Sequence, residues 1–268
     1  MPTDIRLQNG STLSLEIAPP SDRESFFVFG VHKGGSVMIN KILGFINAEL
    51  GIPEILIPMS AFKQGLPDAA FMNAPELDEV LFPTGYCYRT FRYFPPFLEN
   101  FFTTPRRSII LVRDPRDILT SLYFSVTGSH SITGGEAGEV QMRGREQYQD
   151  KDIDTFALEN IGFVRDEFAS YEPLLASDRT RLYRYEDIIF TKAEWIADML
   201  EFLGESLPEA SIRRILDEVD SIPKRERVGR HRRKVIPGDH KEKLQQATIA
   251  KLDEAFRDVF ARYGYAAG

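Results

Sequence analysis

Apolar residues along this chain gather in short runs that alternate with longer amphipathic stretches. The short runs have the length and composition of buried strands and cover residues 26–31, 54–57, 86–90, 108–112 and 181–185. The stretches with helical spacing cover residues 36–49, 115–125, 155–175, 191–203, 208–219 and 239–263. Strands that alternate with helices in this way predict an α/β fold, with a parallel sheet flanked by helices on both faces.

Three segments do not follow this alternation. Residues 1–25 alternate loosely around Asn9-Gly10, a dipeptide that favours a tight turn, and predict an N-terminal hairpin. Residues 58–84 are rich in proline and residues 127–150 in glycine, so we expect two long irregular loops. Such loops usually bind or cover ligands, and we expect these two to bind the acceptor of a reaction. No linker divides the chain, so residues 1–268 are expected to form a single domain.

The first predicted buried strand leads into a loop with the composition of an anion-binding site. Lys33, Gly34, Gly35 and Ser36 follow the strand, and the next amphipathic stretch places them at a helix N-terminus. The N–H groups of a first helical turn are unpaired and partly positive, and glycine lets a phosphate approach the backbone. In the P-loop of nucleoside-triphosphate-binding proteins the lysine follows the glycines, whereas Lys33 precedes them. This order disfavours an ordinary ATPase or GTPase.

A second strand-to-helix junction carries another anion-binding pattern. Arg113 stands at the carboxyl end of the fourth predicted strand, Asp114 can cap the next helix, and Pro115 suits its first turn. Asp117 and Ser121 lie four residues apart and therefore share a helix face. Because arginine donates bidentate, charge-assisted hydrogen bonds to phosphate, the junction predicts a second phosphate contact beside the same crevice.

Together these junctions resemble the sulfotransferases that use 3′-phosphoadenosine 5′-phosphosulfate (PAPS). The loop from Lys33 to Val37 is similar to that family's K-[S/G]-G-[S/T] loop for the 5′-phosphosulfate. The segment from Arg113 to Ser121 matches the family's R-x-P-[R/K]-D-x-x-x-S pattern for the 3′-phosphate. Tyr185 begins a Tyr-Glu-Asp tripeptide that looks like the family's Y-E-D segment, whose tyrosine lies near the adenine.

A basic segment near the C-terminal end extends the resemblance. Residues from Arg233 to His240 are similar to the family's R-K-G-x-x-G-D-W segment, with Val235 in place of the first glycine and His240 in place of the tryptophan. We expect Arg233 and Lys234 to clamp a phosphate of the donor. Nucleic acid is not an expected partner, because the chain has a net charge of −7 and no general attraction for polyanions.

The resemblance implies a P-loop-like fold and transfer of a sulfuryl group from PAPS to a hydroxyl or amine of a small or medium-sized acceptor. Negative charge grows on the leaving phosphate during this in-line displacement, and Lys33 is expected to stabilise that charge. Ser121, by resemblance, also holds Lys33 away from the sulfate until the acceptor arrives. The expected donor-binding residues are Lys33, Gly34, Gly35, Ser36, Val37, Arg113, Ser121, Tyr185, Arg233 and Lys234.

The general base is not assigned by the sequence. Small-molecule sulfotransferases usually carry a histidine in a K-T-H-like segment after the third strand, but Phe91 stands at that position here. His130 and His32 are candidates because neutral imidazole accepts a proton near pH 7. Asp68 and Glu76 are candidates as well, because other branches of the family use an acid.

The composition indicates the setting in which the protein works. No run reaches the roughly 18 apolar residues that a transmembrane helix needs, and the N-terminus lacks a signal-peptide pattern. The single cysteine, Cys87, cannot form an internal disulfide. We therefore expect a cytoplasmic protein without a membrane partner. The four histidines lack the spacing of a metal motif, and we expect a metal-independent reaction. The oligomeric state stays open.

Two other functions remain open from the sequence. A kinase or other phosphotransferase on a P-loop-like core would need a similar cradle, and a strict requirement for magnesium would favour it. A non-catalytic nucleotide-binding protein would bind adenosine 3′,5′-bisphosphate without turnover of any acceptor.

Overall fold

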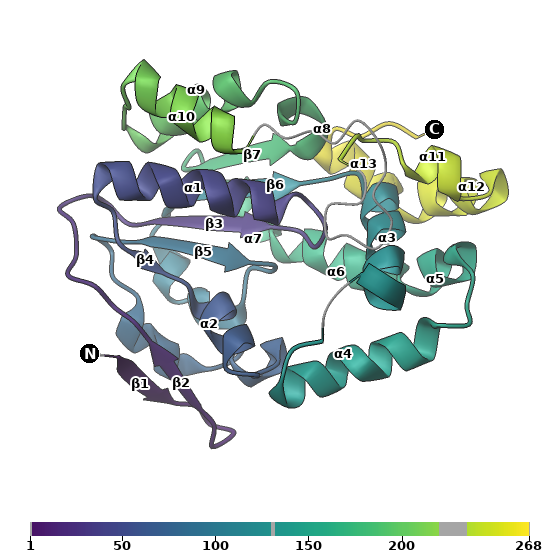
Figure 1. Ribbon diagram of the computed structural model, residues 1–268, viewed down its shortest axis with the longest axis horizontal. Helices are drawn as coiled ribbons and strands as arrows, with labels where there is room; N and C mark the ends of the chain where they lie inside the picture. The colour runs from purple at the N-terminus through teal and green to yellow at the C-terminus, as the bar shows by residue number, and fades with distance from the viewer. Residues whose placement is uncertain (1, 130–131, 220–234, 268) are drawn as a thin grey trace.

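A five-stranded parallel sheet forms the centre of the computed structural model, which describes residues 2–129, 132–219 and 235–267 (Figure 1). Its strands are β3 Phe26–Gly30, β4 Glu54–Ile55, β5 Cys87–Phe91, β6 Arg107–Val112 and β7 Thr180–Arg184. Their order is β4-β5-β3-β6-β7, and every neighbouring pair is parallel. The α/β fold predicted from the alternation of patterns is confirmed.

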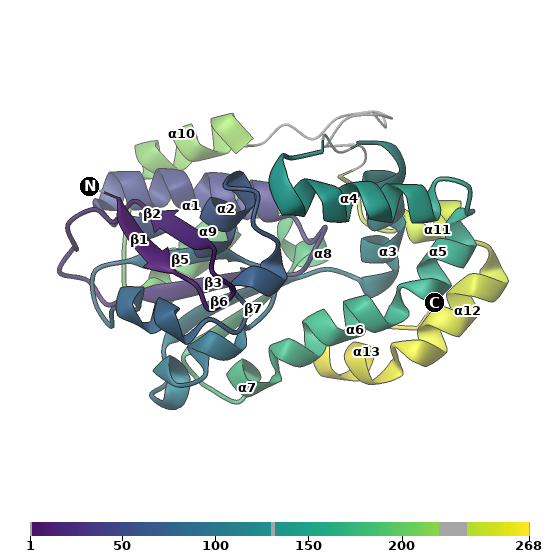
Figure 2. The same cartoon turned by 90° about the horizontal axis from the view of Figure 1, so that it is seen from below.

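Helices cover both faces of this sheet. They are α1 Ser36–Leu50, α2 Ile57–Lys63, α3 Pro115–Phe124, α4 Gly135–Tyr148, α5 Ile153–Glu159, α6 Ile161–Ser170, α7 Glu172–Leu175, α8 Tyr185–Ile188, α9 Lys192–Leu203, α10 Glu209–Val219, α11 His240–Lys243, α12 Gln246–Ala255 and α13 Arg257–Tyr263. Figure 2 shows the sheet between α1 and α10 on one side and α6, α7 and α13 on the other. Within the described residues, no helix combines the length and the apolar character needed to cross a bilayer.

Alternate residues of the buried strands contribute to two separate cores, because successive side chains of a strand point to opposite faces. In β3, Phe26 and Val28 pack with α1 and α9, whereas Phe27 and Phe29 join the core on the other face. The ring of Phe27 stacks on Tyr88 of β5 with 4.6 Å between the ring centres. Burial on both faces explains why the strand reads as a continuous apolar run rather than an alternating one.

The N-terminal hairpin is confirmed. Strands β1 Thr3–Arg6 and β2 Thr12–Leu15 are antiparallel, and Gly10 in the turn between them has a φ of 84°, which glycine tolerates best. The hairpin forms a sheet of its own. It packs against α2, where the main chain of Ser14 exchanges hydrogen bonds of 2.9 and 2.8 Å with the side chain of Gln64.

Two long helices expected from the sequence are each divided into three. Residues 155–175 contain α5, α6 and α7, and residues 239–263 contain α11, α12 and α13. The first break falls at Asn160, whose side-chain amide donates to the carbonyl oxygen of Phe156 at 2.8 Å and so competes with the helical pattern. The break between α12 and α13 falls at Phe256, which is fully buried. Hydrophobic spacing alone does not reveal such short interruptions.

The two segments expected to be irregular contain helices, so that part of the loop prediction is wrong. Helix α2 and two 3₁₀ turns, Asp68–Ala70 and Pro75–Val80, occupy much of residues 58–84. Helix α4 fills most of residues 127–150, although Gly138 and Gly144 lower its intrinsic helix propensity. Gly138 has a packing reason, because a Cβ there would overlap the carbonyl oxygen of Thr133. Gly138, which indicated a loop, therefore permits a close turn at the start of the helix.

Candidate active site

A cavity of about 900 Å³ lies at the carboxyl ends of the central strands. Ligands of open α/β sheets bind in this position. The residues predicted to bind the donor that line it are Lys33, Gly35, Ser36, Val37, Arg113, Ser121 and Tyr185. Gly34 belongs to the same loop without lining the cavity, and Arg233 and Lys234 lie outside the described residues. The structure thus brings together residues that are up to 152 positions apart in the chain.

The loop after β3 is shaped by two left-handed backbone positions. Lys33 has a φ of 58° and Gly35 a φ of 94°. A Cβ on Gly35 would lie 2.7 Å from Cδ2 of Tyr185, so the glycine is required both for its backbone angle and for this close approach. Gly35 caps α1, and the N–H groups of Ser36 and Val37 in its first turn have no intrahelical acceptor. This is the geometry of an anion-binding helix start.

Arg113 connects the two predicted phosphate-binding motifs. Its Nη1 donates to the carbonyl oxygen of Lys33 at 3.1 Å, and its Nη2 donates to Asp117 Oδ2 at 3.3 Å. The guanidinium lies over the ring of Tyr185, 4.8 Å from its centre. The Nε of Arg113 is buried and has no hydrogen-bond partner in the part of the chain that the structure describes. An arginine that lines a cavity and keeps an unused donor suits an anionic ligand.

The side chain of Lys33 reaches the end of α3. Its Nζ donates to the Oγ of Ser125 at 3.2 Å. Ser125 is buried and opens a π-helical turn, Ser125–Ser129, that continues α3; such turns are frequent at functional sites. The sequence predicted this contact for Ser121, which lines the cavity one turn earlier. Ser125 was missed because the resemblance ends at Ser121 and nothing in the sequence marks the change to π-helical geometry.

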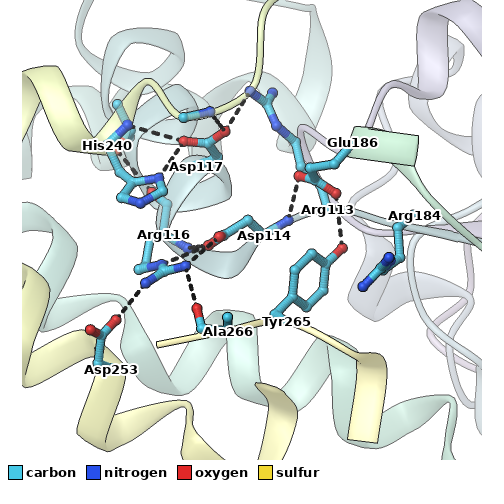
Figure 3. Close-up of polar contacts among 12 residues, drawn as sticks. Arg113, Asp114, Arg116, Asp117, Arg184, Glu186, His240, Asp253, Tyr265 and Ala266 are labelled. Carbon is cyan, nitrogen blue, oxygen red and sulfur yellow. Dashed lines mark hydrogen bonds and ion pairs between the residues drawn. The ribbon is translucent and has the colours of Figure 1, made fainter. Parts of the chain in front are cut away.

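Asp117 joins α3 to the loop before α11 (Figure 3). Its fully buried carboxylate accepts hydrogen bonds from the main-chain N–H groups of Gly238 and His240 at 2.7 and 3.0 Å, and it lies 2.7 Å from Nδ1 of His240. Burial alone would raise its pKa, but the hydrogen bonds from His240 and the charge of Arg113 together hold that pKa well below its ordinary value. The carboxylate is therefore ionised, and it fixes both Arg113 and the adjacent loop.

The other charged residues of this motif do not line the cavity, and Arg116 contacts the C-terminal segment (Figure 3). Arg116 binds Asp114 with bonds of 3.0 and 2.7 Å and Asp253 of α12 with a bond of 2.6 Å. Asp114 Oδ1 also accepts the N–H of Arg116 at 2.9 Å, which confirms Asp114 as the cap of α3. Within one short motif, Arg113 therefore lines the cavity, whereas Arg116 stabilises the packing of the C-terminal helices.

The candidates for the general base lie in different places. His32 and Asp68 line the cavity, Glu76 does not, and His130 lies outside the described residues. His32 contacts Glu167 of α6. Glu167 was not among the residues predicted from the sequence. A signal for Glu167 was present, because this charged residue falls on the apolar face that buries Val164, Phe168 and Tyr171.

Both segments expected to bind the acceptor contribute to the cavity wall. Phe62 comes from the first, and Ile132 and Val140 come from the second. These three apolar side chains are 42, 39 and 48% exposed. Exposed apolar side chains on a concave wall are typical of a site for a small organic ligand. Among residues 2–129, 132–219 and 235–267, no three acidic, histidine or cysteine side chains are grouped to hold a metal ion.

Comparison with known proteins agrees with this arrangement. A family model described as "Sulfotransferase domain" matches residues 88–264, which is more than half of the chain. A mouse sulfotransferase complexed with PAP has a similar structure, with a TM-score of 0.61 and 14% sequence identity over 90% of this chain and 86% of that one. A retinol dehydratase in a complex with retinol and PAP gives a TM-score of 0.51 and 14% identity over 97 and 90%.

No curated protein matches the chain by sequence. The likeness to these solved structures confirms the P-loop-like fold. The family model spans the second phosphate-binding motif, the Tyr185 segment and the loop that Asp117 holds. The chain therefore belongs to the sulfotransferase domain family, and its activity is sulfuryl transfer.

Proposed function

We propose that PAPS is the sulfuryl donor and that it binds where the loop after β3 meets Arg113. The observation that carries this assignment is that Arg113 lines the cavity beside the first turn of α1, with a buried Nε that has no hydrogen-bond partner among the described residues. The mouse and retinol dehydratase relatives, which were solved with PAP, support it. The proposed donor-binding residues are Lys33, Gly34, Gly35, Ser36, Val37, Arg113, Ser121, Tyr185, Arg233 and Lys234.

Lys33 is the proposed catalytic cation. In the in-line displacement, the acceptor oxygen or nitrogen forms a bond to sulfur while the bond from sulfur to the 5′-phosphate oxygen breaks. The leaving phosphate gains negative charge, and a nearby ammonium stabilises that charge more in the transition state than in the bound donor. The first-turn N–H groups of Ser36 and Val37 bind the same phosphate without any side-chain rearrangement.

The proposed acceptor is a small or medium-sized molecule with a hydroxyl or an amine and a largely apolar body. Phe62, Ile132 and Val140 supply the apolar contacts. The retinol bound to the retinol dehydratase relative is an acceptor of this kind in size and polarity. The reaction is proposed to need no metal and to take place in the cytoplasm.

Arg113→Ala is expected to weaken binding of adenosine 3′,5′-bisphosphate about 10- to 100-fold, because a hydrogen bond to a charged group contributes about 1.5–3 kcal/mol. Calorimetry without magnesium measures this, with ATP titrated separately. Arg257→Ala, at an exposed position on α13, serves as the control, and thermal unfolding shows whether each variant is folded. Tighter binding of ATP than of the bisphosphate, with no effect of Arg113→Ala, would reject the donor assignment and favour a phosphotransferase.

Ser125→Ala is expected to raise the rate of PAPS hydrolysis in the absence of acceptor about tenfold. The reason is that Lys33 loses a hydrogen bond worth about 1.5 kcal/mol, which lowers the cost of moving its ammonium to the donor. Release of bisphosphate measures this rate. Ser121→Ala is the matched variant, expected to weaken donor binding without accelerating hydrolysis. If PAPS hydrolysis were faster in Ser121→Ala and unchanged in Ser125→Ala, Ser121 would be the residue that holds Lys33, as the sequence predicted.

A further inference from the structure

His32 stands immediately before Lys33, and both side chains line the cavity. A proton acceptor at this position therefore opens on the same cavity as the proposed catalytic cation. The His32 side chain is 28% exposed, which leaves part of the ring accessible to a ligand while the rest is held by the protein. The position is distinct from Phe91, where the sequence pattern of small-molecule sulfotransferases would place a histidine.

A buried carboxylate holds this histidine. Glu167 of α6 is completely buried, and its two oxygens accept the main-chain N–H of His32 at 3.1 and 3.3 Å. Its Oε1 also contacts Nδ1 of the His32 ring. Within the described part of the chain, His32 is the only ion-pair partner of Glu167. A buried carboxylate is costly unless it is paired, so Glu167 favours a proton on the ring that faces it.

This contact fixes the tautomer of the ring. An ionised carboxylate accepts hydrogen bonds and cannot donate them, so Nδ1 of His32 carries the hydrogen. The lone pair of the neutral ring is then on Nε2. No described residue makes a hydrogen bond to Nε2. The ring itself is packed between Tyr93 and Phe163, whose ring centres lie 6.0 and 5.2 Å away, and these contacts limit its rotation.

We propose that His32 is the general base of the transfer and that Glu167 is its positioning residue; the proposal rests on the proposed function of the same cavity. The acceptor hydroxyl gives its proton to Nε2 as its oxygen forms the bond to sulfur. The bond from sulfur to the 5′-phosphate oxygen breaks, and its electron pair leaves with adenosine 3′,5′-bisphosphate. The imidazolium pairs with Glu167 and later releases its proton to water.

The other candidates fit this role less well. Asp68 lines the cavity, but no described residue orients its side chain by a hydrogen bond, and Glu76 does not reach the cavity wall. The ionisable groups that surround His32 are Lys33 in its own loop, Asp68, Arg92 and Tyr93 in the cavity wall and after β5, and Asp166 and Glu167 on α6. Among the described residues, only Glu167 makes a hydrogen bond to the ring.

The tautomer can be tested without knowledge of the acceptor. In the full-length protein labelled with ¹⁵N-histidine, the nitrogen spectrum at neutral pH should show His32 protonated on Nδ1 and bare on Nε2, with His32→Gln assigning the signals. Glu167→Gln should remove this preference, whereas Glu201→Gln, the same change at an exposed position on α9, should keep it. A hydrogen on Nε2 of His32 in the wild type would overturn the proposal.

Turnover gives the second test, with PAPS as donor and either phenol or water as acceptor. His32→Gln should lower kcat about 10²- to 10⁴-fold while the affinity for the bisphosphate stays within twofold. Glu167→Gln should lower kcat, because the imidazolium loses its carboxylate partner. Glu201→Gln should leave kcat unchanged. A wild-type kcat in His32→Gln would reject the general-base role of His32 and leave the proposed function intact. If the wild-type protein did not bind the bisphosphate, the proposed function itself would be rejected.

Discussion

Lys33→Met is expected to lower kcat about 10²- to 10³-fold, the usual cost of removing one group that stabilises developing negative charge. Methionine keeps much of the length of the side chain and removes the ammonium. The loss should therefore appear in the rate of the chemical step, measured by single turnover at saturating PAPS. Binding of adenosine 3′,5′-bisphosphate should weaken less, because the backbone N–H groups at the start of α1 still hold the phosphate.

Lys251→Met on α12 removes the same charge at an exposed position and is the matched control. Equal losses in the two variants would mean that the protein needs the overall charge and not the position of Lys33. A single-turnover rate in Lys33→Met within a few-fold of the wild type would show that another group bears the leaving-group charge.

Asp117→Asn is expected to lower the free energy of unfolding by about 3–5 kcal/mol, as when one partner of a buried charge network is removed. Arg113 loses its buried counter-charge, and asparagine cannot accept all the N–H groups that now meet the carboxylate. Urea unfolding at neutral pH measures this change. Asp152→Asn, at the exposed cap of α5, is the control with the same chemistry, and little change is expected because asparagine caps a helix as well as aspartate does.

The lowered pKa of Asp117 predicts how the stability of the protein depends on pH. The pKa of Asp117 is lowered in the folded protein, so the unfolded chain binds more protons in acid. Its contribution to stability is complete above its ordinary pKa of 3.8 and declines as the pH falls below that value. Asp117→Asn should therefore lose less stability on acidification than the wild type does. If the free energy of unfolding fell equally with pH in the two proteins, Asp117 would not be the source of the acid sensitivity.

Much of the fold follows from local patterns. The strand containing Phe27, the glycine loop and α1 agree with the sequence prediction within a few residues, because a buried strand and a helix start both leave strong local signals. The same is true of Arg113 and the capped start of α3. By contrast, α4 was expected to be a loop, because Gly138 reads as a breaker. The tertiary contact at the start of this helix, where the N–H of Ala137 donates to the carbonyl oxygen of Gly65 at 2.9 Å, leaves no local signal.

The site was predictable only where its residues are close in sequence. Lys33 and Arg113 each lie in a motif that a few neighbouring residues define. Contacts between residues far apart in the chain were not predictable: Glu167 is 135 positions from the His32 that it holds, and His240 is 123 positions from Asp117. Such contacts depend on how α6 and the loop before α11 pack against the sheet, and no local pattern encodes that packing. A charged residue on an apolar helix face, as at Glu167, was the nearest available signal.

The left-handed backbone of Lys33 has an evolutionary consequence. A side chain at a φ of 58° carries a conformational cost of about 1–3 kcal/mol, which glycine would avoid and asparagine would reduce. The ammonium that the reaction needs thus occupies a position where folding alone favours a different residue. Selection for a more stable protein and selection for faster turnover act in opposite directions here, so drift toward glycine or asparagine at this position would mark a copy of the gene that has kept the fold and given up the chemistry.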